Sequence, residues 1–198
     1  MNNKSLWNHN LAYNKWIKKT IGDRRNILDV GCGNGYLSIY LRNDSNFVVG
    51  IDPSDLSIKT ANEQNNYSNV NFIQTTFERF ETSQTFDAVI FVASVHHMNM
   101  SDAIDKAKAL LNSNGILVIV GLAKPSNMVD WIVECARIIP SGIISIIKKN
   151  KTSEELNMDV SYDLPTMDEI RKISKNKLQG YKMRYGLHYR YLLTWKKR

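Results

Sequence analysis

Short apolar runs alternate with stretches of helical periodicity through the first 120 residues. Five runs have the length and β-branched content of buried strands: Ile27–Val30, Val48–Ile51, Val70–Ile73, Phe86–Val92 and Ile116–Val120. The segments between them are mostly long enough for helices, expected at about Gly35–Arg42, Ser54–Glu63 and Asp102–Leu111. Ser54 and Ser101 are placed as N-caps of the last two helices. The alternation predicts a parallel α/β sheet.

Two further helices are expected outside this alternation. Ahead of the first strand, four apolar residues have the spacing of an amphipathic helix: Tyr13, Trp16, Ile17 and Ile21. Beyond Pro165, the segment Thr166–Ile173 is typical of a helix, with acidic residues in its first turn, where the helix dipole favours them.

The chain ends in a clear alternation. One face of a final strand carries Tyr189, Tyr191, Leu193 and Trp195, and the other carries Arg190, Leu192, Thr194 and Lys196. With Leu178–Tyr185 before it and a break at Gly186, this pattern predicts a terminal β-hairpin.

The length of 198 residues suits one domain, 1–198, rather than two. Within it we expect a helical N-terminal cap over residues 1–24 and an inserted substrate cover over residues 123–164, which starts at the break Ala123–Asn127. The apolar run Met128–Ile147 inside this insertion is interrupted by charged residues and by Pro140, so it is not expected to span a membrane.

The charge is unevenly distributed. The net charge is +7, yet residues 1–120 hold 11 basic and 11 acidic side chains, whereas residues 121–198 hold 15 and 8. Arg171–Arg198 alone has ten basic residues and no acidic one. Such a stretch suits phosphates, an anionic membrane surface or an acidic substrate, and it equally suits a solvated surface.

Two cysteines, Cys32 and Cys135, are too few for a disulfide framework or a multi-cysteine zinc site, so we expect reduced thiols and no structural metal. The N-terminal residues lack the apolar core and cleavage site of a secretory signal. We therefore expect a cytoplasmic protein.

Candidate chemistry begins where the first strand runs into a glycine-rich turn, Asp29-Val30-Gly31-Cys32-Gly33-Asn34-Gly35. Glycines at alternate positions let the backbone approach a ligand closely, and the following helix start offers free N–H groups. The second strand ends at Asp52, which brings a carboxylate suited to ribose hydroxyls beside the same crevice. Together these features predict a site for a nucleotide-like ligand.

The glycine spacing distinguishes between cofactor classes. A dinucleotide fingerprint starting at Gly31 requires a glycine where Tyr36 stands. The observed G-x-G-x-G, opened by Asp29, instead resembles motif I of class I S-adenosylmethionine-dependent methyltransferases. The run Phe86–Ile90 with the following Ala93–Met98 resembles that family's fourth strand and its loop, and Leu110–Val118 resembles the entry to its fifth strand.

This resemblance implies a Rossmann-like seven-stranded sheet, mostly parallel with an antiparallel C-terminal hairpin strand, with helices on both faces. It implies S-adenosyl-L-methionine as cofactor. The residues that it assigns to cofactor binding are Tyr13, Asp29, Gly31, Cys32, Gly33, Gly35, Asp52, Pro53, Thr76, Phe77, Ala93 and Ser94. Among these, Asp29 would hold the ammonium, Asp52 the ribose hydroxyls, and Pro53 and Phe77 the adenine. Thr76 stands where the family usually carries an acid.

Two adjacent histidines are the candidates for catalysis. His96 and His97 follow the fourth strand, where catalytic residues of open α/β sheets often lie, and we expect at most one of them to act as a base. Tyr13 is the candidate for a gate over the cofactor. Cys32 is expected to fill space rather than to act as a nucleophile, and Asp87 is expected to be structural.

The expected acceptor is a small, partly apolar molecule, because the apolar insertion suits a closed pocket. The Asn/Asp-Pro-Pro-Tyr motif of base methylation is absent after the fourth strand, so a nucleic-acid substrate is disfavoured. An RNA methyltransferase that uses the basic C-terminal stretch, and a cofactor-binding protein without catalysis, stay open as alternatives.

Overall fold

The computed structural model describes residues 11–124, 126, 164–186 and 190–198. The predicted substrate cover, residues 123–164, lies outside the described residues except for 123, 124, 126 and 164. The first ten residues of the predicted N-terminal cap and Tyr189 of the predicted final strand lie outside them as well.

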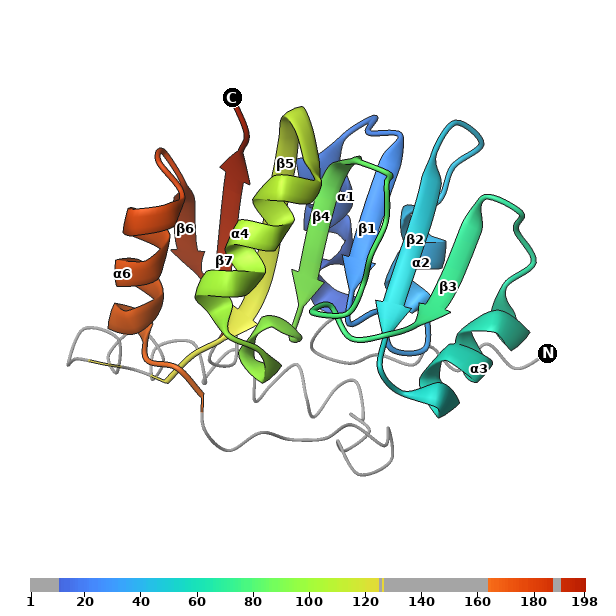
Figure 1. Cartoon of the computed structure of the whole chain (residues 1–198), viewed down its shortest axis with the longest axis horizontal. Coiled ribbons are helices and arrows are strands. Elements are labelled where there is room, and N and C mark those ends of the chain that lie inside the picture. Colours follow the sequence, from blue (N-terminus) through green and yellow to red (C-terminus); the bar gives the residue numbers. More distant parts are fainter. Residues whose placement is uncertain (1–10, 125, 127–163, 187–189) are drawn as a thin grey trace.

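Seven strands form one sheet in the order β3-β2-β1-β4-β5-β7-β6 (Figure 1). Their bounds are β1 Asn26–Val30, β2 Phe47–Asp52, β3 Val70–Gln74, β4 Phe86–Val92, β5 Leu111–Leu122, β6 Lys182–Tyr185 and β7 Arg190–Lys196. Strands β1 to β5 pair in parallel, and β7 lies antiparallel between β5 and β6. This confirms the predicted fold class and the terminal hairpin.

Helices cover both faces of the sheet. Helices α1 (Asn14–Ile21), α2 (Tyr36–Leu41) and α3 (Asp55–Gln64) bury their apolar residues against one face. Helices α4 (Met100–Leu110) and α6 (Met167–Lys177) do so against the other and stand in front of the sheet in Figure 1. Short 3₁₀ turns, η1 (Leu11–Tyr13) and η2 (Val95–His97), precede α1 and α4.

The helix starts follow capping chemistry, with one correction. Ser54 caps α3 as predicted, since its side chain accepts a hydrogen bond from the Ser57 backbone N–H. The predicted cap of α4 at Ser101 is wrong. Asn99 is the cap, because its side-chain oxygen accepts from the backbone N–H groups of both Ser101 and Asp102. Thr166 and Glu169 form a reciprocal capping box at the start of α6.

The final strand, β7, is an inner strand of the sheet. Because β7 lies inside the sheet, between β5 and β6, apolar side chains pack against it on both faces of the sheet. Tyr191 and Leu193 pack toward α4 and α6, and Leu192 packs toward α1. Arg190, which shares a face of β7 with Leu192, is half-buried as a result.

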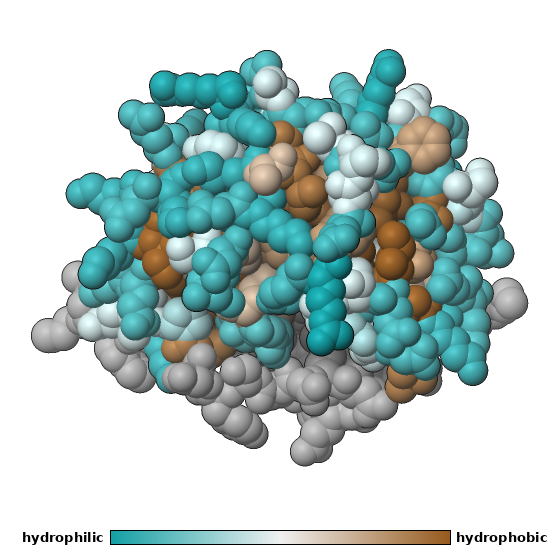
Figure 2. Space-filling model, in the orientation of Figure 1, coloured by the Kyte–Doolittle hydropathy of each residue, from teal (hydrophilic) through white to brown (hydrophobic). Residues whose placement is uncertain are grey.

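Figure 2 shows the molecular surface on the side that faces the viewer in Figure 1. The described part of this surface is mainly hydrophilic, with apolar side chains in small separate areas. Among the described residues, no helix has the length and apolar character needed to cross a membrane.

Candidate functional site

The glycine turn lies at the carboxyl ends of β1 and β2, at the edge where parallel strands commonly present ligand sites. The backbone N–H groups of Gly31 and Cys32 both donate to the carbonyl of Ile51, at 2.8 and 3.0 Å, and so tie the turn to β2. Gly35, at φ 77°, is the residue before the first turn of α2. The turn is therefore held firmly before any ligand arrives.

Two of these glycines are required for different reasons. Gly31 has φ +74°, and a Cβ there would lie 2.4 Å from Cβ of Ser94, so the close approach of the turn after β1 to the loop after β4 needs glycine. Gly33 has φ +52°, and a Cβ there would meet no atom of the described residues within 4 Å. Open space above Gly33 leaves its backbone accessible to a ligand.

Asp29 is buried on β1 below this turn. Its carboxylate accepts a 2.6 Å hydrogen bond from the Ser38 hydroxyl on α2. Burial, opposed by the Ser38 bond and reinforced by the charge of Asp52, raises the pKa of Asp29 to about 6. A buried carboxylate of this kind is stabilised by a cation brought close to it.

Asp52 lies at the end of β2 and points toward the turn. One carboxylate oxygen accepts from the Gly33 N–H at 3.0 Å, and the other accepts from the Ser54 N–H at 2.9 Å. A carboxylate has about four lone-pair directions, so both oxygens can accept further bonds. The two backbone bonds therefore orient Asp52 to receive two hydroxyl groups.

Cys32 is a packing residue in this turn. Its sulfur would lie 3.0 Å from a Cβ on Gly50 of β2. Burial, followed by the nearby charges of Asp29 and Asp52, raises the pKa of the Cys32 thiol far above its ordinary value. The neutral thiol fits the expectation that Cys32 fills space.

The residues expected to border the adenine differ in their burial. Thr76 is half-buried, and its hydroxyl oxygen accepts from the Arg79 N–H at 3.3 Å. Phe77 is buried against Phe91 of β4, with ring centroids 5.3 Å apart in an edge-to-face arrangement. Pro53, after β2, is exposed. Phe77 thus takes its place mainly as a core residue.

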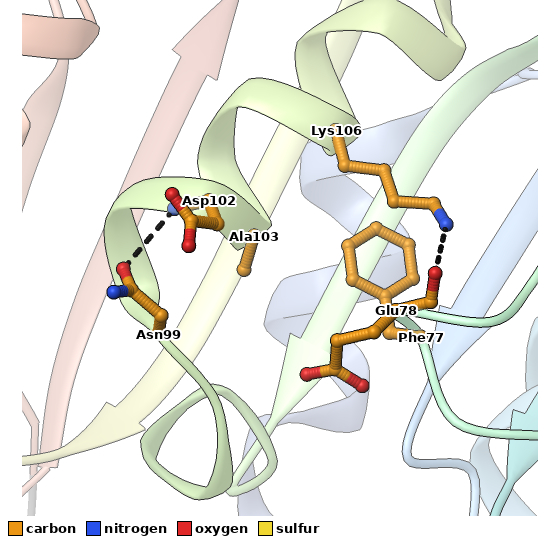
Figure 3. A pocket seen from close by; sticks show the side chains of 6 residues that line it. All are labelled: Phe77, Glu78, Asn99, Asp102, Ala103 and Lys106. Carbon is orange, nitrogen blue, oxygen red and sulfur yellow. Dashed lines mark hydrogen bonds between the residues drawn. The ribbon is translucent and has the colours of Figure 1, made fainter.

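A pocket of about 240 Å³ lies beside Phe77 and α4 and is lined by Phe77, Glu78, Asn99, Asp102, Ala103 and Lys106 (Figure 3). Two of these residues are joined by a hydrogen bond, in which the Lys106 ammonium donates to the Glu78 carbonyl at 2.9 Å. None of its lining residues belongs to the glycine turn, so this pocket is separate from the proposed cofactor residues Gly31–Gly35.

The loop after β4 carries a strained backbone and the two histidines. Ala93 adopts φ +52°, which non-glycine residues rarely do, and its N–H donates to the Val120 carbonyl at 2.8 Å. The Ser94 hydroxyl donates to the Val30 carbonyl at 2.6 Å. These bonds fix the loop directly against the glycine turn.

His96 and His97 have different environments although their ring centroids are 4.1 Å apart. His97 is exposed, whereas His96 is half-buried and its Nδ1 atom is buried with no hydrogen-bond partner among the described residues. Burial, then the charges of His97 and Arg190, lowers the pKa of His96 to about 4. His96 is therefore neutral at physiological pH.

Tyr13 and Arg190 meet near this loop. Tyr13 is buried, and a Cβ on Gly186 would lie 2.8 Å from its hydroxyl oxygen and 3.0 Å from Cβ of Arg190. The Gly186 N–H donates to the Arg190 carbonyl at 2.6 Å. Since Arg190 pairs with Leu122 at the carboxyl end of β5, the cluster lies at the same edge of the sheet as the glycine turn.

A family model described as a methyltransferase domain matches residues 21–180. The chain belongs to this methyltransferase-domain family. The match extends from the end of α1 across the glycine turn and both histidines, and it reaches the turn before β6.

Known relatives share parts of this methyltransferase domain. The chain is 34% identical over 96 residues to the ubiquinone biosynthesis O-methyltransferase of Rickettsia typhi, covering 47% of this chain and 39% of that protein. It is 34% identical over 100 residues to the tRNA U34 carboxymethyltransferase of Pseudoalteromonas translucida, covering 48% of this chain and 31% of that one. The chain thus spans less than half the length of these curated relatives.

A solved structure shares the methyltransferase-domain fold. The plantazolicin methyltransferase BpumL, solved in complex with SAH, superposes with a TM-score of 0.64 at 15% identity, over 96% of this chain and 84% of that chain. At this level of identity the likeness concerns the fold.

Sequence reasoning missed two polar residues of this methyltransferase domain and placed a third correctly. Ser38 donates a hydrogen bond to Asp29, and the charge of Arg190 acts on His96, and both pairs join separate elements of the fold. Asp87 is structural as expected. At the far end of the sheet its carboxylate accepts from the N–H groups of Arg25 and Asn26 and from the Asn112 amide.

Proposed function

We propose that this protein is an S-adenosylmethionine-dependent methyltransferase that acts on a small, partly apolar acceptor. The observation that carries the proposal is the pair of carboxylates around the open backbone of Gly33: Asp29 buried below it and Asp52 bonded to its N–H. The family match supports the reaction class.

The residues fit the cofactor's chemical groups. Asp29, a buried carboxylate with a raised pKa, suits the ammonium of the methionine part. Asp52, already oriented by two N–H groups, suits the two ribose hydroxyls. The turn Gly31–Gly35 is proposed to supply backbone contacts. Ala93 and Ser94 are proposed to bound the site on the side of β4. The region proposed for the adenine is bordered by Pro53, Thr76 and Phe77.

The bound cofactor supplies an electrophilic methyl group on its sulfonium. The protein has to hold an acceptor in line with that group, exclude water and accept any released proton. Positioning alone contributes on the order of 7–11 kcal/mol in favourable cases. A catalytic base can therefore increase the rate, but methyl transfer does not require one.

His96 is the proposed base, and His97 is the second candidate. The Nδ1 atom of neutral His96 is buried and has no hydrogen-bond partner among the described residues, whereas His97 is exposed. Tyr13, which is buried near Arg190, is proposed as the gate over the cofactor.

The RNA alternative receives less support from the described basic residues. Arg171 pairs with Asp168, and Lys177 pairs with Asp105. The Lys197 ammonium donates to the carbonyls of Lys108 and Leu111. Several cations of the C-terminal stretch thus stabilise the fold, which leaves fewer of them for a phosphate backbone.

We further propose that residues 1–198 act as one methyltransferase domain, with residues 1–24 as a cap and 123–164 as the acceptor cover. The cytoplasm is the proposed compartment. Sparse cysteines support this location.

Calorimetry with S-adenosylhomocysteine tests the proposed function. Asp52→Ala should weaken binding by roughly tenfold or more, because paired hydrogen bonds to a carboxylate are lost. Asp55→Ala, which removes an exposed acid three residues further along, is the matched control and should bind normally. Equal affinity of wild type and Asp52→Ala, or tight binding of NAD instead, contradicts the assignment.

A further inference from the structure

The cavity shown in Figure 3 lies between the loop that follows β3 and the first turns of α4, and its volume is about 240 Å³. This size suits a small organic molecule, because a cavity of about 150 Å³ can hold a benzene ring. Apart from Phe77, none of the residues proposed to bind the cofactor lines it. The cavity is therefore a candidate site for a second ligand.

The floor of this cavity is apolar and held in place. It is formed by the side chains of Phe77 and Ala103, both of which are buried. The Phe77 ring has an edge-to-face contact with Phe91, and the Lys106 ammonium lies 5.4 Å from the centre of the ring. Lys106 is itself tied to the Glu78 carbonyl by a hydrogen bond. The floor is thus a preformed surface on which the hydrocarbon part of a ligand can pack.

The rim of the cavity favours a cation. Glu78, from the loop after β3, and Asp102, from α4, both line the cavity and are exposed, and neither carboxylate has a hydrogen bond or ion pair with another described residue. The N–H groups at the start of α4 are not open to an anion, because those of Ser101 and Asp102 already donate to Asn99. With two carboxylates and the single ammonium of Lys106 around it, the cavity attracts positive charge.

We propose that this cavity binds a small amphipathic amine, with its ammonium between the carboxylates of Glu78 and Asp102 and its hydrocarbon part on Phe77 and Ala103. Exposed ion pairs contribute little one at a time, so the apolar contact is needed as well. The combination selects an amine with a hydrocarbon part over an inorganic cation. The site does not depend on the proposed function, because neither carboxylate is assigned to the cofactor or to catalysis.

Phenethylamine, which joins one aromatic ring to a primary ammonium, is the probe. In calorimetry, wild type should bind it with a dissociation constant below about 1 mM, an affinity within reach of a ligand of about nine non-hydrogen atoms. Two molecules of similar shape separate the role of charge from that of the apolar contact: neutral 2-phenylethanol and the anion phenylacetate. Both should bind more weakly than phenethylamine, and phenylacetate most weakly, because the carboxylates repel it.

Substitutions at the rim locate the binding. The double variant Glu78→Gln/Asp102→Asn should bind phenethylamine about fivefold or more weakly, because two exposed charges are removed. Glu81→Gln is the matched control, since Glu81 is an exposed acid on the same loop that does not line the cavity, and it should bind the amine as wild type does. Circular dichroism checks that both proteins are folded.

The methyl group of Ala103 reports on the cavity floor in wild type. Its signal in a ¹H–¹³C NMR spectrum should shift as phenethylamine is added, a result that does not require any variant to fold. The inference is overturned if phenethylamine binds no more tightly than 2-phenylethanol or phenylacetate, if the folded double variant binds it as tightly as wild type, or if the Ala103 signal does not shift.

Discussion

Replacing Asp29 by Asn should stabilise the ligand-free protein at neutral pH and weaken its binding of S-adenosylhomocysteine. Asp29 is buried at the end of β1, and its described hydrogen-bond donor is the Ser38 hydroxyl, which an Asn side-chain oxygen can equally engage. The substitution removes a buried charge and retains this hydrogen bond. Stability and ligand affinity should therefore change in opposite directions.

The magnitude follows from the pKa of Asp29, which rises from its ordinary value of 3.8 to about 6 in the folded protein. At about 1.36 kcal/mol per pH unit, ionised Asp29 costs the folded state about 3 kcal/mol. The new amide has buried N–H groups of its own, which can cost about 1 kcal/mol. Asp29→Asn should then be about 2 kcal/mol more stable than wild type near pH 8.

The pH dependence has a defined sign. Because the folded state holds the Asp29 proton more tightly than the unfolded chain, the wild-type contribution is most favourable below pH 3.8 and is lost as the pH rises through 6. About half of this loss develops between about pH 5 and pH 8. Over that interval the stability advantage of Asp29→Asn should grow.

Urea unfolding at several pH values, with and without S-adenosylhomocysteine, measures both effects. The ligand should stabilise wild type more than Asp29→Asn, since stabilisation follows ligand affinity. Asp44→Asn is the matched control, because the Asp44 side chain is fully exposed, and it should change stability by less than about 0.5 kcal/mol. A less stable Asp29→Asn at pH 8, or a difference that stays constant with pH, would refute the reasoning.

Other substitutions test other parts of the molecule. His96→Gln should lower methyl transfer by roughly 10²–10⁴ with little change in cofactor affinity, and His97→Gln should do less, as steady-state kinetics and calorimetry will report; equal losses in both contradict His96 as the base. Arg190→Met should raise the pKa of His96, measured by NMR titration, because a cation that lowers it is removed; an unchanged pKa contradicts their proximity. Asp87→Ala should lower the free energy of unfolding by about 1–3 kcal/mol without changing cofactor affinity, since three donors lose their acceptor. RNA binding, followed by fluorescence titration at about 50 and 200 mM salt, should be weak; submicromolar affinity that falls about a thousandfold would instead favour the RNA alternative.

Much of the fold could be predicted because it depends on local patterns. The strands that end at the proposed cofactor site are largely continuous apolar runs. Among them, β4 was predicted at its observed bounds, Phe86–Val92. The glycine turn was also recognisable, because positive φ at alternate positions nearly requires glycine. The position of Asp52 beside this turn could be predicted because Asp52 ends the next strand along the chain. Such signals lie within a few neighbouring residues.

The cap of α4 shows where local reasoning is ambiguous. Asn99 and Ser101 are both good N-cap residues within three positions, and only the backbone geometry at Asn99, with its side chain accepting from two N–H groups, decides between them.

The sequence by itself determined the succession of strands and helices along the chain, the glycine turn, and the position of Asp52 at the end of the second strand. Each of these depends on a short-range pattern. Tertiary structure alone decided that β7 enters the sheet between β5 and β6, which half-buries Arg190. It also decided that Ser38 meets Asp29, and that Tyr13, His96 and Arg190 lie at one edge of the sheet. These contacts join residues that are far apart along the chain, and no local pattern of apolar and polar positions specifies which pairs will meet.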